Sequence, residues 1–322
     1  MMKTKLSVIG WVFLLMMVVS SFAASFISLF NIQDHMLENG LGTILLGLPA
    51  VAFLLLQEKT RKEKVRFHWL TWKAILLLMI IAIALELVTI EINIATSFIF
   101  SNYTTDAISN DVSSSTFLIS LICMAVLPAI FEELSFRGAF FQEYRDAYGA
   151  WAGAILSGLL FGLYHMNMRQ FVYAFICGVF FALLVEATDS IASSILMHFM
   201  LNAISCIAIY IVAKFPEQEQ ELAIEAQNQY LLMQLLSFFP IAVIGLVILI
   251  LSYIGLAKCC GQYGIVKEMF SWKNLTFHKR IGSIGTEEMQ SEKTPFRWLF
   301  SFPLVISVIL CIFVILAIEV GM

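Results

Sequence analysis

Residues 115–136, STFLISLICMAVLPAIFEELSF, form an apolar run that ends in two adjacent glutamates, Glu132 and Glu133. A run of about 20 mostly apolar residues is long enough to cross a bilayer as a helix. Ionisable side chains are costly inside a membrane, and those found there usually face a cavity and take part in function. This stretch therefore predicts both a transmembrane helical fold and a functional site within it.

The composition of the whole chain is that of a membrane protein. Of its 322 residues, 60% are hydrophobic and only 13% are charged, and the mean hydropathy is +0.89. Soluble domains are roughly 45–50% apolar and about 25% charged. The net charge of -4 comes with no basic stripe of the kind that binds nucleic acid. We therefore expect an all-α, polytopic transmembrane bundle.

Nine apolar stretches are candidates for membrane-spanning helices, so we expect about eight to nine spans. They are 6–30, 41–57, 73–100, 115–136, 150–166, 170–187, 191–213, 230–256 and 298–320. The first follows Lys3 and Lys5 and loosely resembles a signal peptide, but its length favours an uncleaved helix.

The distribution of positive charge predicts how the chain sits in the membrane. Lys and Arg gather in the connections 58–73 and 257–297, whereas 31–40, 101–114 and 214–229 are mainly acidic. We predict an integral protein of the cell (plasma) membrane with a cytoplasmic N-terminus and a cytoplasmic loop over 257–297.

Several common catalytic and metal-binding motifs are absent from the sequence. It contains no HExxH, no GxSxG and no P-loop. Its six cysteines show no CxxC spacing, which argues against a disulfide framework and against a thiolate metal site. Any chemistry must come from other residues.

A helical hairpin is expected to bring Glu132 and His165 to the same depth. The helical pattern of 115–136 continues to Ala147, and Tyr148-Gly149 forms a turn before Ala150. Glu132 lies 15 residues before Ala147, and His165 lies 15 residues after Ala150. At 1.5 Å per residue, both lie roughly 22 Å from the turn.

A second polar pair, His198 and Asn202, lies in the stretch 191–213. The two residues are four apart and share one face of a helix. We expect Asp189 to cap this helix at its start. The pair lies roughly 14 to 20 Å along the helix, close in depth to the hairpin residues.

These residue types are suited to hydrolysis. A carboxylate together with an imidazole deprotonates a water, and a second imidazole with a carboxamide donates to an oxyanion. Alternatively, Glu132, His165 and His198 form the ligand set of an open catalytic zinc site. Glu133 and Arg137 are spaced for an ion pair and have a supporting role.

Each pair alone also has a simpler interpretation. Adjacent glutamates are often solvated at a helix end, and a membrane histidine is often a packed, hydrogen-bonded residue. Their joint occurrence within 71 residues favours one functional site. Glu86 and Glu91 lie within 73–100, and a polar contact between helices is favoured there over cavity lining or binding of a substrate cation. A transporter that uses these two residues as proton sites would show repeat symmetry, which the sequence lacks.

Three motifs together resemble those of the CAAX-protease and bacteriocin-processing (CPBP, or Abi) family of intramembrane proteases. They are Glu132-Glu133-x3-Arg137, Phe161-x3-His165 and His198-x3-Asn202, and the resemblance covers about residues 115–210. The family implies packed transmembrane helices around a water-accessible cavity. It also implies peptide-bond hydrolysis, classically the release of the last three residues from prenylated C-termini.

The resemblance implies roles for individual residues of this chain. Glu132 and His165 would activate the water, and His198 and Asn202 would form the oxyanion site. The enzyme would be a metalloendopeptidase if Zn2+ is used, or would work without a metal. Its partners would be a membrane-associated peptide or protein substrate and the lipid bilayer. The alternative is a non-catalytic bacteriocin-immunity or membrane-scaffold protein of the same fold.

The predicted organisation places this catalytic core between two flanking helical regions. The core covers 115–213, with N-terminal transmembrane helices over 1–114 and C-terminal ones over 214–322.

Overall fold

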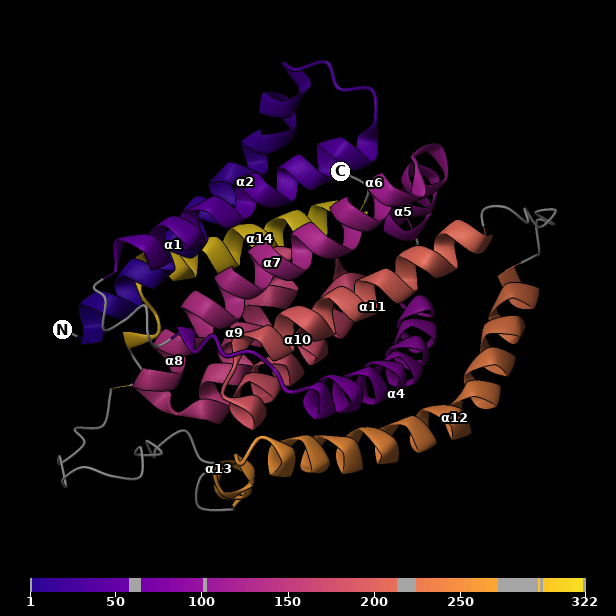
Figure 1. Ribbon diagram of the computed structural model, residues 1–322. Helices are drawn as coiled ribbons and strands as arrows, with labels where there is room; N and C mark the ends of the chain where they lie inside the picture. The colour runs from indigo at the N-terminus through magenta and orange to yellow at the C-terminus, as the bar shows by residue number, and fades with distance from the viewer. Residues whose placement is uncertain are drawn as a thin grey trace, which may run out of the picture.

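The fold is a helical bundle in which long apolar helices lie side by side (Figure 1). The computed structural model describes residues 2–57, 65–100, 103–212, 224–271, 295 and 298–320, and these contain helices and connections but no strand. Seven of the helices are long and apolar enough to cross a membrane, and two more are apolar but shorter. Together they correspond to the nine predicted stretches, so the predicted all-α, polytopic membrane bundle is confirmed.

The fold consists of one long central helix over residues 117–148 and ten further helices in the described part of the chain. These further helices are, in chain order, α1 (Met2–Ser28), α2 (His35–Leu56), α4 (Trp72–Ser97), α5 (Tyr103–Ser114), α9 (Ala150–Tyr164), α10 (Met168–Thr188), α11 (Ile191–Val212), α12 (Ile224–Cys259), α13 (Tyr263–Met269) and α14 (Phe302–Val320). Helix α4 packs against α12 on one side and against α10 and α11 on the other. In Figure 1, α12 runs along the edge of the bundle beside α4.

Parts of the orientation prediction fall outside the residues that the structure describes. These parts are residues 58–64 of the basic connection 58–73, residues 214–223 of the acidic connection 214–229, and the loop 257–297 beyond residue 271 except for residue 295. The cytoplasmic placement of the N-terminus and the plasma-membrane location remain predictions.

The central helix is continuous from Phe117 to Tyr148 but changes its winding twice. It consists of α6 (Phe117–Leu121), the π-helix η2 (Ile122–Val126), α7 (Leu127–Glu133), the π-helix η3 (Leu134–Phe140) and α8 (Phe141–Tyr148). Pro128, which lacks a backbone N–H, is the second residue of α7 and so lies two residues after the end of η2. Short π-helical turns are rare and often occur at functional sites. Here they flank the segment that carries both glutamates.

The predicted hairpin between the central helix and α9 is confirmed. Gly149 adopts φ 91°, a conformation that favours glycine, and it ends α8 and begins α9. The next helix, α10, approaches α9 closely. A Cβ on Gly178 would lie 2.9 Å from Cα of Gly158, and a Cβ on Gly158 would lie 2.7 Å from Val179. Larger residues at these two positions would force the helices apart.

The start of α11 differs from the prediction. Asp189 does not cap this helix, because it adopts a left-handed conformation at the end of α10, with φ 53° and ψ 29°. The hydroxyl of Ser190 instead accepts a hydrogen bond from the amide of Ala192 at 3.2 Å. A serine one residue later therefore takes the capping role, which the sequence pattern does not distinguish from the aspartate.

Candidate functional site

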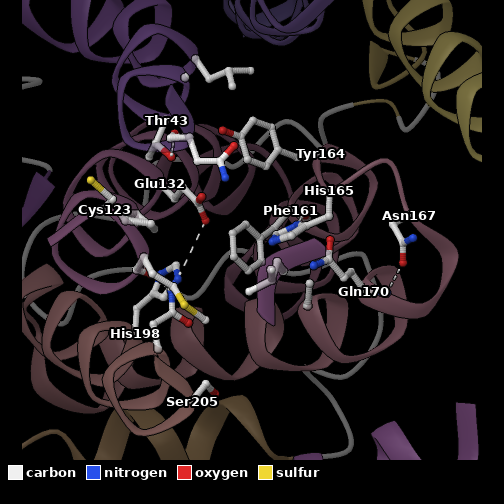
Figure 2. Close-up of a pocket in the computed structure, with 18 of the residues that line it drawn as sticks. Thr43, Cys123, Glu132, Phe161, Tyr164, His165, Asn167, Gln170, His198 and Ser205 are labelled. Atoms are coloured by element: carbon white, nitrogen blue, oxygen red, sulfur yellow. Dashed lines mark hydrogen bonds and ion pairs between the residues drawn. The ribbon is translucent and has the colours of Figure 1, made fainter. Parts of the chain in front are cut away.

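A cavity of about 890 Å³ lies within the bundle. Its lining comes from α1, α2, α4, α5, the central helix, α9, α10 and α11, and includes Glu132, His165, His198 and Asn202. Figure 2 shows Glu132 and His198 facing each other, with His165 beyond the ring of Phe161. The structure thus brings the four predicted catalytic residues into one space, as expected from their matched depths.

His198 lies between the two adjacent glutamates. Its Nε2 is 3.9 Å from Oε2 of Glu132, and its Nδ1 is 2.9 Å from Oε1 of Glu133. An ionised carboxylate can only accept hydrogen bonds, so Nδ1 of His198 is the donor to Glu133. This contact fixes the ring and leaves Nε2 directed at the cavity side of the site, toward Glu132.

Glu133 in turn is held by Arg137, as the spacing predicts. Nη1 of Arg137 donates to Oε1 of Glu133 at 2.9 Å, and neither side chain is exposed. Nη2 donates to the carbonyl of Gly178 at 3.0 Å. The guanidinium also lies over the rings of Phe161 and Phe181, 4.5 and 5.1 Å from their centroids. Arg137 is therefore a positioning residue that acts on His198 through Glu133.

His165 is oriented by the main chain of its own helix. Its Nδ1 lies 2.8 Å from the carbonyl oxygen of Phe161. Because a carbonyl oxygen only accepts, Nδ1 carries the proton, and in the neutral ring Nε2 keeps its lone pair. The ring packs edge-on against Phe161 at 4.9 Å and Tyr164 at 5.7 Å. The ring of Phe161 is also 5.8 Å from that of His198, so it separates the two imidazoles.

Asn202 connects α11 to the central helix. Its side-chain amide donates to the carbonyl of Met124, within η2, at 2.9 Å. A carboxamide has two N–H donors, so one remains for a ligand in the cavity. Asn167, just after His165, accepts from the amide of Gln170 at 2.9 Å and caps α10.

The suggested zinc ligands do not converge. In the described part of the chain, no group of three His, Cys, Asp or Glu side chains is close enough to hold a metal ion. Each imidazole uses Nδ1 for a hydrogen bond, that of His165 to the carbonyl of Phe161 and that of His198 to Glu133, and Nε2 of each ring remains available. Glu132, His165 and His198 therefore do not form a grouped ligand set among the described residues, and the zinc alternative remains a prediction.

Two supporting hydrogen bonds were not predicted from the sequence. The hydroxyl of Ser157 donates to the carbonyl of Phe136 at 2.7 Å, and the amide of Gln142 donates to the carbonyl of Arg137 at 3.1 Å. Both acceptors lie in η3. A serine and a glutamine that are buried in apolar helices are the signal that would have pointed to them.

Comparison with known proteins found one family model that is similar to the segment containing this site. Residues 114–204 match the family model described as Type II CAAX prenyl endopeptidase Rce1-like. Searches of curated proteins and of solved structures gave no match. The matched segment is less than a third of the chain, but it contains all three motifs and every residue from Glu132 to Asn202 described above. Over residues 114–204 the chain is therefore similar to CAAX-type prenyl endopeptidases, in agreement with the resemblance carried by the three motifs.

Proposed function

We propose that this protein hydrolyses a peptide bond of a membrane-associated protein or peptide, with a water activated by Glu132 and His165. One observation carries the proposal: a carboxylate and two imidazoles from three helices line a single cavity of about 890 Å³. The description of the matching family, a prenyl endopeptidase, supports the same reaction.

The first step is proton removal from water. A water held between the carboxylate of Glu132 and the lone pair on Nε2 of His165 loses a proton to one of them. The resulting hydroxide attacks the carbonyl carbon of the scissile bond, and the carbonyl oxygen becomes an oxyanion. When the C–N bond breaks, the same proton moves to the leaving amine.

The oxyanion is stabilised by donors on α11. In its doubly protonated form, His198 donates from Nδ1 to Glu133 and from Nε2 to the oxyanion. The second amide hydrogen of Asn202 supplies another donor. Donors held in fixed positions cost no reorganisation during the reaction, and the buried Glu133–Arg137 pair provides that rigidity for His198.

A peptide-cleavage assay tests these roles. The purified protein is given a farnesylated peptide that ends in a CAAX sequence, and the same peptide without the lipid. Glu132→Ala and His165→Ala are each expected to lower kcat/KM by at least about 100-fold, because each removes one partner of the activated water. Glu91→Gln, a change on α4 at a residue that does not line the cavity, is the matched control.

Cleavage that is unchanged in both alanine variants would reject the assignment. The cellular counterpart uses Glu132→Gln. If that variant keeps the full cellular phenotype, the protein acts as the non-catalytic immunity or scaffold protein instead. Cleavage of the lipidated peptide alone would identify a prenylated substrate.

Metal analysis tests the zinc alternative separately. The active protein is treated with a chelator, and its metal content and activity are measured together. Full activity with no bound metal is expected, because the donors do not converge on one point. Stoichiometric zinc, with activity lost on chelation and recovered on adding zinc, would show that the reaction depends on a bound zinc ion.

A further inference from the structure

Helix α4 contributes a polar wall to the cavity. Glu86, Thr89 and Asn93 are spaced three and four residues apart, share one face of α4, and all line the same cavity as Glu132 and His165. None of them belongs to the three motifs, and α4 lies outside the segment matched by the family model. The wall is therefore a property of this chain that the family resemblance does not explain.

Glu86 differs from the buried carboxylates Glu133 and Glu186, which are both paired with arginine. It lies 14 residues after Trp72, which is roughly 21 Å along the helix and deep in the apolar span. Its carboxylate accepts one weak hydrogen bond, from the hydroxyl of Thr89 at 3.4 Å. Glu133 pairs with Arg137, and Glu186 pairs with Arg66 and Arg145. Among the described residues, no Lys, Arg or His forms an ion pair with Glu86.

A carboxylate at this depth needs a compensating group. Ionisable residues inside membranes typically pair with an opposite charge or face a cavity that admits a ligand. The charged side chains along the described cavity lining are Glu38, Glu86, Glu132 and Arg169, so carboxylates predominate. Such a cavity favours a ligand that brings positive charge.

We propose that Glu86 is a specificity residue that binds a Lys or Arg side chain of the peptide substrate. Thr89 and Asn93, farther along the same face, supply hydrogen-bonding groups to the backbone of the bound peptide, because an extended peptide within the membrane cannot obtain them from lipid. This inference rests on the proposed function, since its ligand is the substrate of that reaction.

The experiment is a lysine scan of the substrate. A farnesylated, quenched-fluorescence peptide is made as a series in which one Lys replaces a norleucine at each successive position around the cleaved bond. The wild-type protein is expected to prefer Lys at one position or two neighbouring ones. Glu86→Gln should lower the ratio of kcat/KM for the Lys peptide to that for the norleucine peptide by about tenfold or more. Glu86→Lys should reverse the preference toward a peptide with Glu at that position.

Glu91→Gln, on the same helix but outside the cavity lining, is the control and should leave the ratio unchanged. Wild-type cleavage without any positional preference for Lys would overturn the specificity role while leaving the proposed function intact. An equal fall for Lys and norleucine peptides in Glu86→Gln would assign Glu86 a structural role and also overturn it. If no peptide is cleaved, or if Glu132→Ala cleaves them as well as the wild type, the proposed function itself fails.

Discussion

At the residue scale, two chemically identical neighbours have different surroundings. Glu132 faces the cavity with 12% of its side chain exposed, whereas Glu133 is fully buried between Arg137 and His198. Adjacent residues of a helix point in directions about 100° apart, so only one of them can face a given space. The carboxylate of Glu132, which faces the cavity, is suited to the proposed proton transfer. The carboxylate of Glu133, which is paired with Arg137, is suited to orienting the imidazole of His198.

Removal of Arg137 tests this division. Arg137→Ala leaves Glu133 buried without its counter-charge, and breaking such a pair costs about 3–5 kcal/mol. We expect a marked fall in the unfolding temperature of the detergent-solubilised protein. Lys73→Ala removes an exposed cation from α4 and serves as the control.

The double change Glu133→Gln with Arg137→Met adds a second readout. It leaves no unpaired charge, so its loss of stability should be smaller than that of Arg137→Ala alone. If Arg137→Ala unfolds at the wild-type temperature, the pair has no structural role.

At the element scale, the buried carboxylate of Glu186 forms ion pairs that connect three segments of the chain. Glu186 on α10 is 2% exposed and lies 2.6 Å from Nη2 of Arg66 and 2.6 Å from Nε of Arg145. Arg66 precedes α4, and Arg145 lies in α8. Glu186 therefore connects the segment before α4 and the C-terminal end of the central helix to α10. This contact lies close to the hairpin between α8 and α9.

The change Glu186→Gln is expected to lower the unfolding temperature strongly, since it leaves two guanidinium groups without their shared partner. Asp189→Asn is the matched control. Asp189 also contacts Arg66, at 3.2 Å, but 43% of its side chain is exposed, and exposed pairs contribute at most about 1 kcal/mol. Equal losses from the two changes, measured by thermal unfolding, would contradict the proposed importance of the buried contact.

At the scale of the whole molecule, the cavity joins the family segment to helices outside it. The motif residues come from the central helix, α9 and α11, whereas α1, α2, α4, α5 and α10 contribute further lining residues. The proposed catalytic residues thus lie within residues 114–204, and part of the cavity lining lies outside that segment. Under the proposed function, differences in the flanking helices would change the substrate without changing the reaction.

The sequence predicted much of this molecule because its signals are local or periodic. Apolar runs of membrane length predicted the nine apolar helices, and Tyr148-Gly149 predicted the turn of the hairpin. Four-residue spacing gave both the Glu133–Arg137 pair and the shared face of His198 and Asn202. These relations depend only on helix geometry, which is the same wherever a helix forms.

Other features depended on contacts between segments far apart in the chain. Glu86 was favoured as a contact between helices, but it lines the cavity, and Glu186 showed no local sign of its two arginine partners. The π-helical turns η2 and η3 were also not predicted, because the extra residue in a π-helical turn changes the sequence pattern very little.

The sequence by itself determined the membrane helices, their hairpin and the polar residue types proposed for hydrolysis, since hydrophobic length and helical spacing depend only on the order of residues. Only the tertiary structure decided which glutamate faces the cavity, how each histidine ring is oriented and which wall carries Glu86. Those properties follow from the rotation and packing of each helix against the others. That packing depends on close contacts such as Gly158 against Gly178, which no single helix contains.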